Sequence, residues 1–215
     1  ENYLGNLKDY REPAEISSND EDSKTEDETI DALKKEYNTM IESVLRYDGF
    51  YVARYEAGLD KTTKEIVFKN ANVADNNNVT TDASTNETKT WNGLYKKIKE
   101  FTTINDKVVS NMICGSQYDA MLNWMLKTGN IIEDEGKTKK NTWTITGKEE
   151  NDVLNNIYDL FGCHNEWTLE AYDYYGRVLR GGRTDDINTS TYMRNGVSTG
   201  RTDSYYSSRA TLYIK

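Results

Sequence analysis

Residues 156–168 read NIYDLFGCHNEWT, and residues 177–182 read RVLRGG. The first stretch mixes aromatic rings with acids and amides, and the second ends in two glycines that permit positive φ or close backbone approach. A buried Trp167 ring, together with Asp159 and Glu166 hydrogen-bonded to loop amides, would hold irregular segments in place. We therefore expect structural roles for these three residues.

Between residues 183 and 208 the chain is almost entirely polar. Strand-like segments flank it at 177–180 and 210–214, so that it lies inside what reads as the last hairpin. Its aliphatic-type side chains are Ile187, Met193 and Val197 alone. Long structureless insertions are usually functional or disordered, and Tyr, Ser, Asn, Gly and Arg are typical of adaptable binding surfaces. The alternative is a plain surface loop.

The rest of the chain divides into an acidic N-terminal part and one domain. Residues 1–29 are interpreted as an arm or linker, because 11–29 are acidic and poor in aromatics, and residues 30–215 as the domain. A capping box at Thr25 and Glu28 precedes the first helix. Apolar periodicity predicts helices over 30–45, over 91–101 and from Ser116 to Gly129, strands over 50–55 and 143–146, and a surface loop over 70–90.

Composition excludes several classes of partner. The chain has 215 residues, of which 36% are hydrophobic, enough for one sizeable core. With 36 acidic and 27 basic residues, its net charge of -9 disfavours nucleic acid and anionic membranes. No apolar run approaches the length of a membrane-spanning helix, so we expect no membrane insertion.

No catalytic or metal-binding constellation stands out. The two cysteines, Cys114 and Cys163, are expected to be buried free thiols, since their spacing suits neither a disulfide framework nor a metal cluster. His164 follows Cys163 directly, and neighbouring side chains in an extended chain point apart, which disfavours a nucleophile and base pair. We expect a structural histidine, no catalytic residue, no metal site and no cofactor.

Five ordered motifs resemble one fold. The chain resembles the formylglycine-generating-enzyme type of C-type lectin fold from about Tyr37 to Lys215. The family patterns N-x-Y-D-x-x-G-N-x-x-E-W-T, R-V-x-R-G-G and S-R-x-x-L correspond to residues 156–168, 177–182 and 208–212, its opening strand to 49–56 and its second helix to 118–124. This resemblance implies an α+β, loop-rich C-type lectin fold of that subtype.

The same resemblance argues against the family's enzymatic activity. Formylglycine-generating members depend on two cysteines in the insertion after R-G-G, and residues 183–208 contain none. Cys163 replaces the family's metal-associated Asn, which puts a structural calcium in doubt. Sugar-binding C-type lectins use a cis-proline beside calcium, whereas the one proline of this chain is Pro13.

One branch resembles the chain more closely: the variable proteins of diversity-generating retroelements. In that branch, adenine-directed mutagenesis rewrites AAY codons, which then encode many residues but never Lys, Glu or Gln. Residues 183–208 contain none of these three, and Met193, unreachable from such codons, would be fixed. The resemblance implies a variable ligand-binding region at about 165–212.

The predicted function is recognition without catalysis. The ligand would be a protein or glycan on a target cell surface, and the chain would lie in a phage tail or on a bacterial surface. The alternatives are a formylglycine-generating-type enzyme with altered chemistry and a structural virion or surface domain. The predicted ligand-binding residues are Arg183, Thr184, Asp186, Asn188, Ser190, Tyr192, Arg194, Asn195, Ser198, Thr199, Arg201, Asp203, Tyr205 and Tyr206. We expect the Tyr and Arg members of this set to be the anchors. The expected fixed frame around them is Arg180, Gly181, Gly182, Ser208, Arg209 and Leu212.

Overall fold

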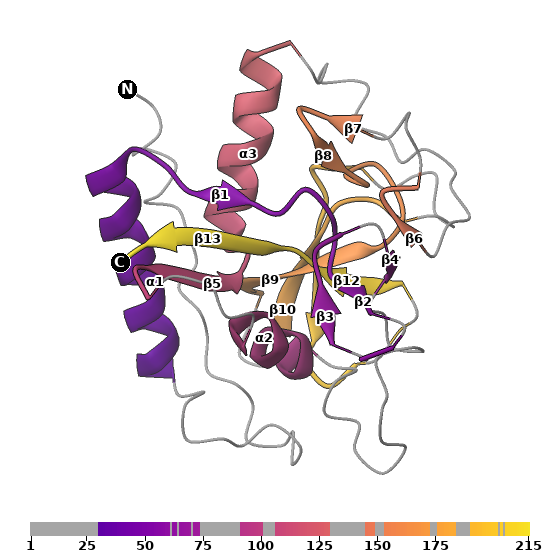
Figure 1. Ribbon diagram of the computed structural model, residues 1–215, viewed down its shortest axis with the longest axis horizontal. Coiled ribbons are helices and arrows are strands. Elements are labelled where there is room, and N and C mark those ends of the chain that lie inside the picture. The colour runs from indigo at the N-terminus through magenta and orange to yellow at the C-terminus, as the bar shows by residue number, and fades with distance from the viewer. Residues whose placement is uncertain are drawn as a thin grey trace.

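The computed structural model is an α+β fold whose described part contains three helices and four small sheets (Figure 1). It describes residues 30–60, 62–63, 65–69, 71–73, 91–100, 106–129, 145–148, 153–172, 176–183, 190–201, 203 and 205–215. The predicted arm at 1–29, with its capping box, and most of the predicted 70–90 loop lie outside these residues. The described part of that loop, Ala71–Val73, is a strand, so the loop prediction is wrong there. None of the described helices is long and apolar enough to cross a membrane.

The helices and strands follow one another in mixed order. The helices are α1 (Ile30–Tyr47), α2 (Trp91–Glu100) and α3 (Gly115–Lys127). The first strands are β1 (Tyr51–Val52), β2 (Gly58–Leu59), β3 (Ile66–Val67), β4 (Ala71–Val73), β5 (Val108–Met112), β6 (Ile145–Thr146), β7 (Val153–Leu154) and β8 (Ile157–Tyr158). The C-terminal strands are β9 (Asn165–Ala171), β10 (Gly176–Arg180), β11 (Arg194–Ser198), β12 (Tyr206–Ser208) and β13 (Ala210–Ile214).

Apolar periodicity explains α1 and α2. In α2, Trp91, Leu94, Tyr95 and Ile98 recur at intervals of three and four residues, and each is at most 1% exposed. This stripe packs into the larger core together with Trp167 of β9. The helices predicted over 30–45 and 91–101 are therefore confirmed, with ends shifted by one or two residues.

The start of α3 differs from the prediction. Ser116 was expected to cap this helix, but the N-cap is Cys114, and the Ser116 hydroxyl has no hydrogen-bond partner among the described residues. The reason is Gln117, whose Oε1 accepts a hydrogen bond of 2.9 Å from the Cys114 amide. The same oxygen accepts one of 3.0 Å from the Thr211 hydroxyl, so that the cap also ties α3 to β13.

Two sheets organise the interior. In the first, β13 crosses the middle of the molecule between β1 and β5, and it is antiparallel to both (Figure 1). The second has the order β11-β10-β9-β12, with β12 parallel to β9. The other two sheets are β3-β2-β4-β6 and β7-β8. The strand predicted over 50–55 is present but shorter, as β1, and the described part of the strand predicted over 143–146 forms β6.

The expected last hairpin is not formed. The strands β10 and β13 belong to different sheets, because β10 pairs with β9 and β11 while β13 pairs with β1 and β5. The segment between them is also not structureless, since it supplies β11 and β12. It runs along β10 as an antiparallel partner, with Arg180 opposite Arg194, and returns beside β9.

Arg209 lies where the chain passes from one sheet to the other, between β12 and β13. It is fully buried, and its guanidinium donates to both Glu166 oxygens at 2.6–3.1 Å. It also donates to the backbone carbonyls of Ala53 and Tyr158 at 2.9 and 2.8 Å. One side chain thus joins three segments, and Glu166 binds this arginine rather than the expected loop amides.

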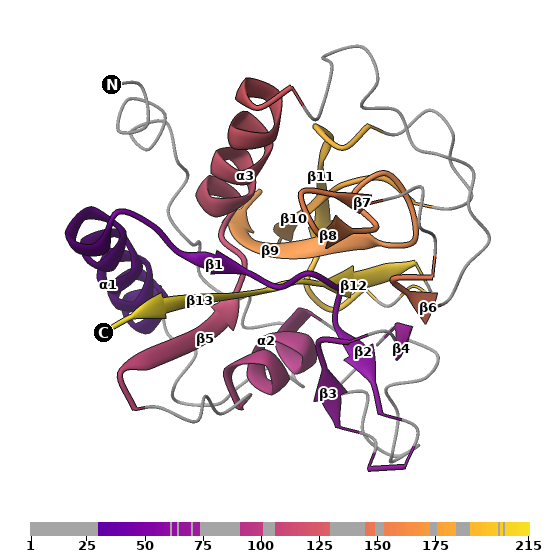
Figure 2. The ribbon, with the colours of Figure 1, turned by 45° about the horizontal axis from the view of Figure 1, so that its top comes forward.

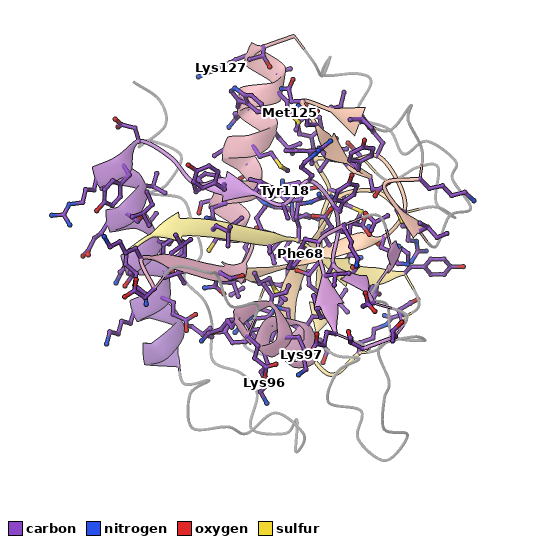
Figure 3. The ribbon with its side chains drawn as sticks, in the orientation of Figure 1. Phe68, Lys96, Lys97, Tyr118, Met125 and Lys127 are labelled. Carbon is purple, nitrogen blue, oxygen red and sulfur yellow. The ribbon has the colours of Figure 1, made fainter. Side chains whose placement is uncertain are left out.

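The predictions for Trp167, Asp159 and Gly181 agree with the structure. Trp167 is fully buried, and Asp159 Oδ2 accepts the Gly147 amide at 2.7 Å, as expected for a residue that pins a loop. Gly181 has φ +78°, and an added Cβ would lie 2.9 Å from the Tyr118 hydroxyl. Tyr118 lies on the inner side of α3, near the centre of the molecule in Figure 3.

Candidate functional site

The predicted ligand-binding residues fall into four groups by exposure. Exposed are Arg194, Asn195, Ser198 and Arg201. Partly buried are Arg183, Ser190, Tyr192, Asp203 and Tyr205. Buried are Thr199 and Tyr206. Outside the described residues lie Thr184, Asp186 and Asn188.

The exposed group gathers on β11 and the turn that follows it. β11 is an end strand of its sheet, and only β10 pairs with it among the described residues. Arg194, Gly196 and Ser198 alternate along the strand and therefore share one face, whereas Val197 on the other face is 7% exposed and packs in the core. The turn continues from Ser198, whose carbonyl accepts the Arg201 amide at 3.0 Å.

Tyr172, at the end of β9, belongs to the same face although it was not among the predicted residues. Its ring lies directly on the backbone of Gly196, where an added Cβ would be 2.0 Å from the ring. The side chain is nevertheless 50% exposed. An exposed aromatic ring between two polar side chains is a typical contact residue. We call Tyr172, Arg194, Gly196, Ser198 and Arg201 the β11 face.

Acidic residues beneath this face hold Arg194 in position. It contacts Asp119 of α3 and reaches Glu170 of β9 at 3.3 Å. The buried Arg180 contacts the same two carboxylates, at 2.7 and 3.8 Å. Burial raises the pKa of Glu170, and the two arginines oppose that rise. Figure 2 shows β11 on the same side of the molecule as α3, which allows this network to form.

Two of the predicted ligand-binding residues are buried and therefore do not lie on the exposed surface. Tyr206, expected as an anchor, is 3% exposed and packs edge-on against Trp167 with ring centroids 5.3 Å apart. Thr199 is 1% exposed, and its carbonyl accepts the Trp91 amide at 3.3 Å. Both pack inward because β12 and the end of β11 lie against the core. The exposed part of the C-terminal region is thus narrower than the predicted range of 165–212.

Buried polar contacts hold the frame around the β11 face. The Ser208 hydroxyl donates to the Trp167 carbonyl at 2.9 Å, and the Asn165 amide donates to the Gly181 carbonyl at 2.8 Å. Among the expected frame residues, Arg180, Ser208 and Arg209 are at most 1% exposed. These contacts fix the backbone on both sides of β11 without using its exposed side chains.

A second polar cluster lies in the interior, at Cys163 and His164. The expectation that these side chains point apart is wrong. Cys163 has φ +64°, so the chain is not extended there, and its Sγ lies 3.1 Å from His164 Nδ1. The same ring nitrogen lies 3.5 Å from Oε2 of Glu56, a residue distant in sequence. The Glu56 pKa is raised well above its usual value by burial, and further by Asp159 and Glu166.

The three side chains of this cluster include donor atoms that bind metals. Sγ of Cys163, a ring nitrogen of His164 and a carboxylate oxygen of Glu56 all lie within 4.8 Å of one another. No metal site was expected, because the spacing of cysteine and histidine along the chain gives no such pattern. Glu56 joins them only through the tertiary fold. Both cysteines are buried and free, as predicted.

An apolar groove of about 720 Å³ lies on another side of the molecule. α1, β1 and α3 form its walls, with Met40, Val52 and Met121 in its lining. Exposed rings at its edge include Tyr51, which is 67% exposed, and Trp124, which is 44% exposed. Its composition suits contact with apolar groups rather than acid and base chemistry.

Comparisons of the chain with protein-family models, with curated proteins and with solved structures found no match.

Proposed function

We propose that this chain is a non-enzymatic recognition protein that binds a protein or glycan on a cell surface through its β11 face. The observation that carries the proposal is the separation of exposed and buried residues in the C-terminal region. The exposed side chains of β11 and its turn vary in chemistry, and a fully buried frame holds their backbone. Such a scaffold tolerates changes of contact residues without loss of the fold.

The proposal includes a C-type lectin scaffold of the formylglycine-generating subtype and membership of the variable proteins of diversity-generating retroelements. The five motifs and the lack of Lys, Glu and Gln in residues 183–208 support it. The position of residues 183–208 also supports the proposal, because β10, which precedes this segment, and β12, at its end, are buried. A phage tail or a bacterial surface is the proposed location.

The alternative of an enzyme with altered chemistry is less well supported. Cys163 is fully buried, and Cys114 is 4% exposed, with its thiol pKa raised by burial. Both polar contacts of His164 in the buried cluster use Nδ1. In a catalytic triad, by contrast, the histidine contacts the nucleophile through one ring nitrogen and the orienting group through the other. A peptide substrate would have no direct access to either thiol.

A binding experiment with matched variants tests the proposal. Fluorescent multimers of the full chain are applied to a panel of bacterial cells and to a glycan array, and bound fluorescence is measured. The test variant is Tyr172→Ala/Ser198→Ala/Arg201→Ala, whose three side chains all belong to the β11 face. The control is Lys69→Ala/Lys97→Ala/Glu100→Ala, which removes three exposed side chains elsewhere and changes the net charge by the same amount.

We expect the test variant to lose binding and the control to keep it. Equal binding by both variants would show that the recognition surface does not lie on β11. Sequencing related isolates gives an independent check: substitutions should concentrate at exposed positions within 183–208. Substitutions spread evenly along the chain would contradict a variable region.

A further inference from the structure

The buried cluster of Glu56, Cys163 and His164 lies away from the β11 face, and the recognition function does not use it. The segment after β1 supplies Glu56, and the turn before β9 supplies the other two residues. Their exposed fractions are 0%, 0% and 3%. Burying three such groups together is costly unless something compensates for their polarity.

The geometry suits a shared cation better than a catalytic relay. Bond lengths to zinc of about 2.0–2.3 Å in a tetrahedral site place neighbouring ligand atoms roughly 3.3–3.6 Å apart. The observed separations are 3.1 Å between Cys163 Sγ and His164 Nδ1 and 3.5 Å between that nitrogen and Glu56 Oε2. Both contacts involve the same nitrogen, and all three donor atoms lie within 4.8 Å of one another.

The orientation of Glu56 is the second observation. Its Oε1 accepts the His164 backbone amide at 3.3 Å, which turns Oε2 toward the cluster. That Oε2 is fully buried and accepts no hydrogen bond from the described residues. The carboxylates of Asp159 and Glu166 further raise the Glu56 pKa, and Arg209, which lowers it, already binds Glu166. Oε2 of Glu56 is therefore available as a ligand atom at this point of the interior.

We propose that Glu56, Cys163 and His164 bind one divalent cation of the zinc class. A thiolate, an imidazole and a carboxylate are the donors that zinc prefers, whereas calcium takes oxygen ligands. When the ion binds, the Cys163 thiol and the Glu56 carboxyl release the protons that they hold to solvent, and a water molecule completes four-coordination. The burial of the site assigns the ion a structural role: it joins the segment after β1 to the turn before β9.

Cobalt substitution tests the site in the full-length chain. The protein is stripped with chelator and titrated with Co²⁺, and the absorption spectrum is recorded before Zn²⁺ is added. We expect one Co²⁺ per chain, a tetrahedral ligand-field spectrum with a thiolate-to-cobalt band, and displacement by one equivalent of Zn²⁺. We also expect zinc to raise the midpoint of thermal unfolding.

Variants assign the ligands. Cys163→Ser should abolish the thiolate band and Glu56→Gln should lower zinc affinity by at least about tenfold, whereas Cys114→Ser, the matched control, should keep both. If Cys163→Ser does not fold, the wild-type and Cys114→Ser spectra decide alone, because the chain has two cysteines. A wild-type spectrum without the thiolate band, or a band that Cys114→Ser removes, would overturn the proposal.

Discussion

Single residues decide how the C-terminal region is attached to the core. Arg209 is the clearest case, because a fully buried guanidinium joins Glu166 to carbonyls of two other segments. The bidentate contact with Glu166 raises the pKa of Arg209 although burial alone would lower it, so the side chain stays charged. Removing it would leave the Glu166 charge buried without compensation.

We therefore expect Arg209→Ala to lower the free energy of unfolding by about 3–5 kcal/mol, or to prevent folding. Urea denaturation followed by circular dichroism measures the change. Arg201→Ala is the control, with an expected effect within about 0.5 kcal/mol because its side chain is exposed. Comparable losses in the two variants would contradict the role of Arg209.

A second prediction at this scale concerns the contact between Tyr172 and Gly196. Gly196→Ala should destabilise the fold by about 1–3 kcal/mol, because the new methyl group overlaps the tyrosine ring. In a Tyr172→Ala background the same change should cost much less. Denaturation of the four proteins of this double-mutant cycle measures the coupling, and a cost that is the same in both backgrounds would show that the ring does not lie on this glycine.

At the scale of elements, the start of α3 depends on a side chain that also binds β13. Gln117→Ala should lower stability by about 1–2 kcal/mol, since both the Cys114 amide and the Thr211 hydroxyl lose their acceptor. Ser116→Ala should cost no more than about 0.5 kcal/mol, because the Ser116 hydroxyl makes no hydrogen bond within the described part of the chain. Thermal unfolding of both variants is the measurement, and the reverse order would restore Ser116 as the cap.

The attachment of β11 to α3 and β9 should depend on pH. Because the Glu170 pKa is raised in the folded protein, the proton it holds favours folding at low pH, and this contribution is lost as pH rises through the folded pKa. Arg194→Ala removes a charge that opposes this rise. The variant should therefore lose about 0.5–1 kcal/mol at pH 7 and less at pH 4, as measured by urea denaturation. A loss that does not change with pH would contradict the ion pair.

For the whole molecule, the division into a frame and an exposed face predicts where sequence change is tolerated. In a surface-displayed library sorted for protease resistance, most substitutions at Asn195, Ser198 and Arg201 should survive. Substitutions at Trp167 and Arg209 should be depleted, because both side chains are fully buried. Similar survival at all five positions would argue against the division.

Local patterns in the chain predicted much of this molecule. The stripe of Trp91, Leu94 and Ile98 predicts α2 because apolar spacing of three and four residues places one face toward a core. The burial of Trp167 and the positive φ of Gly181 also followed from the residue types and their neighbours. Such features depend on interactions within a few residues.

Tertiary structure alone decided the partners and the exposed surface. The chain between β10 and β13 looked like the inside of a hairpin, because strand pairing between distant segments leaves no local pattern. Tyr206 reads as a surface residue until β12 lies beside β9 and buries it against Trp167. Glu56 meets Cys163 only through the fold.

The sequence by itself therefore determined the three described helices and some of the strands, and that the C-terminal region is polar and suited to contacts. The tertiary structure decided which of those polar side chains face outward, on β11, and which join the core. The physical reason is that periodicity and conformational preference are local, whereas burial and ion pairing depend on what the rest of the chain brings near.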